Sequence, residues 1–265
     1  MVACFSVIGT SPASARVIYV KILVDEEERT RRDVWQIRLK QRLDRASEII
    51  NEYCDIQFAL SEFGVWQSDN RETQINRSLR EFEQEVEVAP AQIAIGFTSQ
   101  YRFRKGINGL GGTRGPLHTH ILIREASPNT QEPERLEALV HELGHFLGAA
   151  HSGNPKSVMR PIIANGLTRF NGSPIAFDRR NAKILQLVGT EVSALGLQKF
   201  HQLSDLTRRR LLVEYKGLAA ELPQDPAAKQ YIRYLHRRAR QPTSTSQLRL
   251  PVAPQGRQRS TSAPR

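Results

Sequence analysis

Apolar residues follow two different spacings in the first part of the chain, and each spacing predicts one kind of element. The run RVIYVKILVD at residues 16–25 is rich in β-branched side chains, which is typical of a buried strand. Residues 26–53 instead carry apolar side chains at helical spacing, with charged residues on the opposite face. This stripe consists of Trp35, Leu39, Leu43, Ala46, Ile49, Ile50 and Tyr53. The pattern therefore predicts a strand followed by a long helix.

The alternation of strand and helix patterns continues as far as residue 147. Further strands are predicted at residues 56–66, 91–98 and 117–125, and further helices at residues 73–86 and 129–147. A glycine-rich loop at residues 99–116 precedes the last of these strands. Because strands alternate with helices, we predict an α/β fold with a twisted, mostly parallel sheet and a long backing helix.

The sequence predicts helices from residue 175 to residue 240 and no regular structure after them. A helix is predicted at residues 175–187, and Gly196 marks a candidate boundary. Residues 197–240 are expected to form a basic helical extension that Pro223 and Pro226 divide into two helices. Residues 241–265 combine Ser, Thr, Pro, Gln and Arg without periodicity, so we expect a disordered tail.

The positive charge of the chain is concentrated near its C-terminus. The 265 residues carry a formal charge of +11, and residues 205–265 hold 13 Lys/Arg against 4 Asp/Glu. Clustered arginines could bind an anionic surface or a nucleic acid. These arginines are Arg208, Arg209, Arg210, Arg237, Arg238 and Arg240. No apolar run is long enough to predict a membrane-spanning helix, and the oligomeric state is left open.

The N-terminal sequence and the number of cysteines indicate where in or outside the cell the protein is expected to act. Residues 1–15 are apolar and end in the small-x-small sequence Ala13-Ser14-Ala15, although no basic residue precedes them. We expect a short signal peptide and export to the periplasm or beyond the cell, the alternative being a disordered or strand-forming N-terminus of a cytoplasmic protein. Cys4 and Cys54 are too few for a disulfide framework or a cysteine zinc site.

The densest candidate chemistry lies in the sequence HELGHFLGAAH at residues 141–151. His141 and His145 are four residues apart and share one face of a helix. A continuous helix would carry His151 roughly 15 Å away, but Gly148 tolerates the positive φ of a sharp turn. The spacing predicts three imidazoles around one Zn²⁺ ion, with Glu142 placed to act as a general base. The five-residue H-E-x-x-H core alone also occurs by chance; the added glycine and third histidine make the pattern specific.

Two further sets of residues are candidates for the same site. Met159 follows His151 closely and is expected to turn back as a hydrophobic base beneath the metal, rather than to fill the core generically. His118 and His120 point the same way from the predicted strand, and with Ile121 they are candidates for substrate binding or, for the histidines, a second metal. The alternative for both histidines is an ordinary polar role on an edge strand.

HELGHFLGAAH followed by SVMRP resembles the metzincin clan of zinc endopeptidases. Ser152 after the third histidine and the Ser-Val-Met-x-Pro order are most similar to the matrixin branch. The resemblance implies an α+β zincin-type fold, with a catalytic domain at residues 16–196 that contains an active-site helix and a small C-terminal subdomain. It also implies that an edge strand at residues 117–125 pairs with substrate and that residues 160–174 wall the S1′ pocket.

The resemblance also implies roles for individual residues. His141, His145 and His151 would hold one catalytic Zn²⁺, Glu142 would be the general base, and Met159 would form the Met-turn. Structural Ca²⁺ is left open, because no clear ligand set is visible. The implied function is peptide-bond hydrolysis by a zinc metalloendopeptidase. The alternatives are an inactive peptide-binding protein of the same fold and a binder of anionic polymers or nucleic acid through the basic C-terminal region.

Overall fold

The fold is built on a five-stranded sheet with the strand order β2-β1-β3-β5-β4. The computed structural model describes residues 15–100, 111–125, 130–163 and 174–239. The strands are β1 (Arg16–Asp25), β2 (Ile56–Trp66), β3 (Ile93–Thr98), β4 (Gly111–Thr113) and β5 (His120–Arg124). All neighbouring strands are parallel except β4, which runs antiparallel to β5. The predicted α/β class with a mostly parallel sheet is confirmed.

The prediction for the edge strand was wrong. β5 is an interior strand, because it pairs with β3 on one side and with β4 on the other. The edge strand on this side of the sheet is β4, whose sequence Gly-Gly-Thr lies inside the segment that was predicted to be a loop. Two glycines carry no side-chain pattern from which a strand could be predicted, and backbone pairing with β5 alone defines this strand.

Helices cover both faces of the sheet, so the central strands are buried on both sides. On one face, α1 (Arg32–Asn51) and α3 (Glu132–Phe146) pack in the main core. On the other face, α2 (Ile75–Glu85) packs through a smaller apolar cluster. That cluster contains Leu23, Trp66, Leu79, Phe82, Val86, Ala94 and Leu122. The helix predicted at residues 26–53 begins only at Arg32, because the chain first turns after β1 with a hydrogen bond from Glu28 to Asp25.

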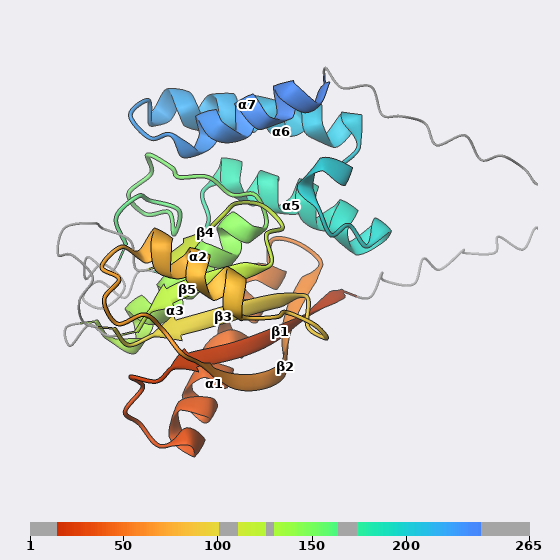
Figure 1. Cartoon of the computed structure of the whole chain (residues 1–265). Helices are drawn as coiled ribbons and strands as arrows, with labels where there is room; N and C mark the ends of the chain where they lie inside the picture. The colour runs from red at the N-terminus through yellow and green to blue at the C-terminus, as the bar shows by residue number, and fades with distance from the viewer. Residues whose placement is uncertain (1–14, 101–110, 126–129, 164–173, 240–265) are drawn as a thin grey trace, which may run out of the picture.

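Three helices follow the histidine motif and form a stack on one side of the sheet (Figure 1). They are α5 (Arg179–Leu195), α6 (Asp205–Glu221) and α7 (Ala227–Ala239), with the short helix η1 (Phe200–Gln202) before α6. The helix predicted at residues 175–187 begins later and runs further, because Asp178 caps its N-terminus and Gly196, at φ +65°, ends it. The predicted break between α6 and α7 is confirmed.

The helices after Gly196 share the core of the sheet. Leu203, Leu211, Tyr215 and Leu235 are buried in the same apolar cluster as the strands β1 and β3. The region expected as an extension is thus built into the body of the protein. None of the helices that the structure describes is long and apolar enough to cross a membrane. The predicted signal at residues 1–15, apart from its last residue, the tail at 241–265 and most of the 160–174 wall lie outside the described residues.

Candidate metal centre

The three histidines of the motif converge on one point. His141 and His145 lie one turn apart on α3, with ring centroids 4.6 Å from each other. The chain then reverses at Gly148, whose φ is +92°, and brings His151 to centroid distances of 5.4 Å from His141 and 5.0 Å from His145. Their ligand atoms all lie within 4.8 Å of one another. The helix, the glycine turn and the returning third histidine are placed as the spacing predicts.

Hydrogen bonds orient the two helical imidazoles. Nδ1 of His141 lies 2.7 Å from the carbonyl oxygen of Val158, and Nδ1 of His145 lies 2.8 Å from that of Ala149. A carbonyl oxygen can only accept, so each Nδ1 must carry the proton and donate. The lone pair of each ring is therefore on Nε2, which is left to bind a metal.

The third histidine is oriented by a carboxylate from a distant element. Nδ1 of His151 lies 2.7 Å from Oδ2 of Asp225, in the segment that joins α6 to α7. The other oxygen of Asp225 accepts from the backbone N–H of Ala227 at 2.8 Å, which fixes the carboxylate. A carboxylate behind a ligating imidazole raises the basicity of the ligand. Sequence reasoning missed Asp225, since nothing local in its sequence marks it as part of this site.

Burial sets the charge of the site. It lowers the pKa of His141 well below the ordinary value and, with the nearby His151, lowers the pKa of His145 to about 4. Both rings are therefore neutral at pH 7, as metal binding requires. Burial also raises the pKa of Glu142 to about 8. Its Oε2 is buried and has no hydrogen-bond partner among the described residues.

The donor set fits zinc. Three neutral imidazoles with an open fourth position make a catalytic zinc site, and Glu142, which follows the first histidine in the chain, has an oxygen without a partner among the described residues. The His141, His145 and His151 set is the one group of three metal-ligating side chains that the described residues bring together.

Met159 packs directly against the helix that carries the ligands. Its side chain is fully buried, and a Cβ atom on Gly144 would lie 2.8 Å from its Sδ. The turn is held by two further bonds: Ser152 donates its N–H to the Met159 carbonyl at 2.9 Å, and Ser157 donates its hydroxyl to Asp178 at 2.8 Å. The sulfur thus lies against the turn of α3 between the first two histidines.

An ion pair joins this turn to the same helix. Nη1 of Arg160 lies 2.6 Å from Oε1 of Glu137, which precedes His141 by one helical turn. Both side chains are almost completely buried, with exposed fractions of 8% and 2%. The pair therefore fixes the turn at Met159 to α3 from a second direction. Neither residue was predicted to belong to the site.

The edge strand passes directly beside Glu142. A Cβ atom on Gly111 would lie 2.7 Å from both Cγ and Oε1 of Glu142, so only glycine leaves room for the carboxylate. β4, the edge strand of the sheet among the described residues, therefore lies next to the candidate base. This is the position that the sequence analysis assigned to the strand at residues 117–125.

The three proposed substrate-binding residues lie outside the metal-binding group. His120 is buried toward α2, where its Nε2 lies 2.9 Å from the Val86 carbonyl oxygen. Ile121 is fully buried in the main core. His118 precedes β5 and lies 3.8 Å from Glu83 of α2. None of the three belongs to the metal-binding group among the described residues.

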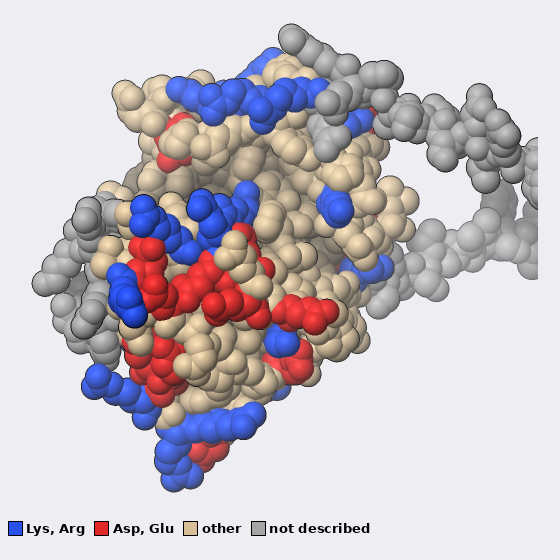
Figure 2. Space-filling view, in the orientation of Figure 1, with Lys and Arg blue, Asp and Glu red and all other residues tan. Residues whose placement is uncertain are grey.

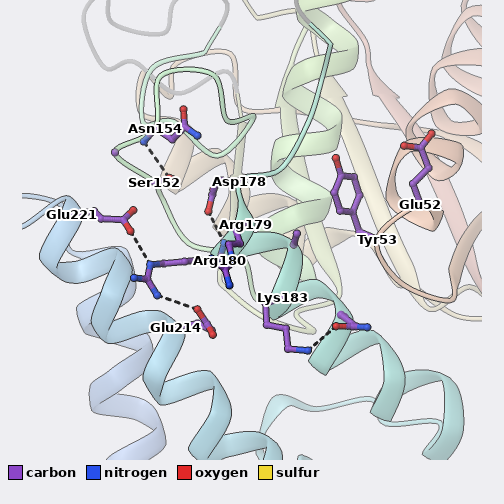
Figure 3. Close-up of a pocket in the computed structure, with 13 residues that line it drawn as sticks. Glu52, Tyr53, Ser152, Asn154, Asp178, Arg179, Arg180, Lys183, Glu214 and Glu221 are labelled. Carbon is purple, nitrogen blue, oxygen red and sulfur yellow. Dashed lines mark hydrogen bonds and ion pairs between the residues drawn. The ribbon is translucent and has the colours of Figure 1, made fainter.

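A cavity of about 1220 Å³ lies between α5, α6 and the loop after His151 (Figure 3). Arg180 crosses it and bonds Glu221 at 2.7 Å and Glu214 at 3.2 Å. Its charges are thereby paired across two helices, and Gly217 of α6 leaves room for the guanidinium. These two ion pairs hold α6 against α5 within a cavity that Ser152 also lines.

Comparisons with known proteins agree with the site. The sequence matches the reprolysin-type profile of metallo-peptidase family M12 over residues 14–170, a segment that contains all three histidines and Met159 but ends before α5. The matching family is thus the reprolysin type, and the matrixin-like features are limited to Ser152 and residues 157–161. A search of curated proteins finds no match.

Three solved structures align with part of this chain. Archaemetzincin from Methanopyrus kandleri is 19% identical, with a TM-score of 0.46, over 64% of this chain and 95% of that one. Archaemetzincin from Archaeoglobus fulgidus, complexed with malonate, is 16% identical, with a TM-score of 0.40, over 64% of this chain and 99% of that one. A chaperone–substrate complex is 12% identical, with a TM-score of 0.46, over 68% of this chain and 36% of that one. Because the family profile matches more than half of its length and the three histidines are intact, the chain is a metallopeptidase of family M12.

Proposed function

We propose that this metallopeptidase is a zinc-dependent endopeptidase that cleaves extended polypeptide segments, with Glu142 as its general base. The observation that carries the proposal is the convergence of the three histidines, the first of which is followed directly by Glu142 with a buried oxygen that has no hydrogen-bond partner among the described residues. His141, His145 and His151 would hold the ion. When bound, zinc supplies a Lewis acid that acidifies a coordinated water and stabilises negative charge on the substrate oxygen.

Glu142 moves the proton in this proposal. Its carboxylate takes the proton from the water that attacks the scissile carbonyl and then delivers it to the leaving amine. The carboxylic acid that forms when Glu142 takes up the proton is the donor in the second step. No side chain acts as a nucleophile, so we expect no covalent intermediate.

The edge of β4 would orient the substrate. Its N–H and C=O groups on the side away from β5 can add an extended peptide to the sheet. Gly111 lies against Glu142, so a peptide paired along β4 would place a backbone carbonyl near the base. This arrangement favours cleavage within a chain over removal of a terminal residue.

The decisive experiment compares the wild type with Glu142→Gln. The glutamine has nearly the same shape and leaves the three histidines in place, but it cannot accept a proton. We expect Glu142→Gln to retain one zinc per chain and to lose cleavage of casein and of quenched-fluorescent peptides, by roughly three or more orders of magnitude. Equal cleavage by the two proteins, or a chelator-insensitive wild type, would contradict the proposal. Absence of cleavage by zinc-loaded wild type would favour an inactive peptide-binding protein.

A further inference from the structure

A groove with a cavity of about 790 Å³ begins where β4 ends. One wall consists of residues 114–119, and the opposite wall consists of η1 and α7. We name it the basic groove and define it by Arg114, Lys199, Phe200, Tyr231, Arg233 and Arg237. We propose that the basic groove is a substrate subsite for an acidic side chain of the peptide, about three residues from the scissile bond. This inference rests on the proposed endopeptidase function.

The position of the groove relative to Glu142 follows from β4. Gly111 lies against Glu142, and Arg114 is three residues further along the chain. A strand rises about 3.4 Å per residue, so the groove begins about 10 Å from the base along the substrate path. A peptide paired with β4 would therefore pass Glu142 and continue into the groove.

Tyr231 separates the groove from the catalytic residues. A Cβ atom on Gly115 would lie 3.6 Å from its Cε1, so α7 reaches the end of the β4 segment. Burial, followed by the negative charges of Glu142 and Asp225, raises the pKa of the Tyr231 phenol, and both carboxylates are thus near it. Tyr231 thus lines the groove and lies near Glu142 and Asp225 of the metal centre.

The charge of the groove is positive and largely unpaired. None of its lining residues is acidic. Arg114 is bound to Glu83 at 2.8 Å. Lys199, Arg233 and Arg237 have exposed side chains, and none of them takes part in the ion pairs found among the described residues. Figure 2 shows a band of Lys and Arg along α7, above a hollowed, uncharged surface.

The spacing and the floor of the groove fit a carboxylate on a short apolar stem. Arg233 and Arg237 are four residues apart, so they lie on one face of α7. A guanidinium binds a carboxylate through two parallel N–H donors. The half-buried rings of Tyr231 and Tyr234 also line the groove, 6.5 Å and 5.9 Å from the ring of Phe200, and offer an apolar surface to the methylene groups of glutamate.

The groove suits an acidic peptide better than a nucleic acid. Three unpaired cations at one end of a substrate path match one or two carboxylates. A nucleic acid needs a longer stripe of cations to neutralise successive phosphates. Arg209 and Arg210 of α6 do not line the groove.

The test uses pairs of quenched-fluorescent peptides that differ only in Glu, Gln or Lys three residues from the cleaved bond, on each side in turn. We expect the full-length, zinc-loaded wild type to prefer Glu over Lys by about tenfold in kcat/KM on one side. The double variant Arg233→Glu with Arg237→Glu should reverse this order. Arg233→Lys with Arg237→Lys should keep it, which separates loss of charge from loss of folding.

The matched control is Arg209→Glu with Arg210→Glu, the same change of charge on exposed positions outside the groove. It should leave the order of the peptides unchanged. An unchanged order in the groove variant would overturn the inference, as would an equal reversal in the control.

Binding separates this inference from the proposed function. Fluorescence anisotropy measures the affinity of the Glu142→Gln protein for a labelled Glu peptide without turnover. Loss of that affinity on adding the groove substitutions supports the subsite even where cleavage fails. Unchanged peptide affinity, together with loss of binding to a labelled single-stranded oligonucleotide, would overturn the subsite and assign the groove to nucleic acid.

Discussion

Oδ2 of Asp225 lies 2.7 Å from Nδ1 of His151, although the two residues are 74 positions apart in the chain. The contact ties the third histidine of the metal centre to the connection between α6 and α7. It lies beyond residue 170, where the match to the M12 profile ends. In this protein the helical C-terminal region therefore takes part in positioning a metal ligand.

Removal of the Asp225 carboxylate should weaken zinc binding. Asp225→Ala leaves His151 in the chain but frees its ring to rotate and lowers its basicity. Loss of such a partner typically costs 10- to 100-fold in metal affinity. Competition with a chromophoric zinc chelator measures this directly. Asp205→Ala in α6, an exposed aspartate paired with Arg208, should retain wild-type affinity; equal affinity of all three proteins would contradict the role of Asp225.

Tyr215 fixes the glycine turn of the motif. Its hydroxyl donates to the carbonyl oxygen of Gly148 at 2.6 Å, and the side chain is fully buried. Tyr215→Phe removes the donor and leaves a buried carbonyl unsatisfied, so we expect a loss of about 1–2 kcal/mol in the free energy of unfolding. Urea unfolding followed by circular dichroism would show it. Tyr234→Phe, a half-buried tyrosine on α7, should change the stability by less than about 0.5 kcal/mol.

Gly144 should not tolerate a methyl group. On an exposed helix, Gly→Ala stabilises by up to about 1 kcal/mol. Here the new Cβ would lie 2.8 Å from Met159 Sδ and 2.8 Å from Phe177 Cε1, and overpacking of this kind costs about 1–3 kcal/mol. We therefore expect Gly144→Ala to lower the melting temperature and to weaken zinc binding. Gly112→Ala, where the nearest atom lies 3.8 Å away, should leave the melting temperature unchanged; a stabilised Gly144→Ala would show that Met159 is free to move.

Glu125 should make the protein sensitive to acid. Burial alone would raise its pKa, but hydrogen bonds from Arg42 and the charges of Arg42, Arg135 and Arg38 outweigh burial and lower it. The unfolded chain, with an ordinary pKa of about 4.3, therefore takes up this proton first as the pH falls. The stabilisation is complete above about pH 5 and is lost below roughly pH 4.

The variant Glu125→Gln tests this contribution. At pH 7 it leaves Arg42 with only Glu132 as a partner, and we expect a loss of about 3 kcal/mol in the free energy of unfolding. The difference from wild type should narrow as the pH falls from 5 to 3, as measured by urea unfolding at each pH. Glu48→Gln, in an exposed pair with Arg45, should show no such narrowing. A difference that stays constant with pH would contradict the assignment.

Features that depend on local sequence were predictable. The β-branched run of β1, the apolar stripe of α1 and the histidine spacing with its glycine turn all follow from residues near one another. Features that depend on the packing of distant segments against one another could not be predicted. Asp225 reaches His151 only because α6 and α7 pack on the core, and Arg160 meets Glu137 only because the turn at Met159 folds under α3.

The edge strand β4 could not be predicted from the sequence for a different reason. β4 is defined by backbone hydrogen bonds to β5 and by the space that Gly111 leaves for Glu142, neither of which has a side-chain signature. His118 and His120 carried a stronger signal but turn toward α2. Export through residues 1–15 and disorder of residues 241–265 stay predictions.

The contact between His151 and Asp225 has a consequence for the order of events during synthesis. A ribosome delivers the three histidines well before it delivers the segment that holds the third one in place. Until α6 and α7 have docked, His151 lacks its carboxylate and the emerging polypeptide should retain metal poorly. The protease would then gain its full zinc affinity only after nearly all of the described fold is complete, which would protect neighbouring nascent chains from premature cleavage.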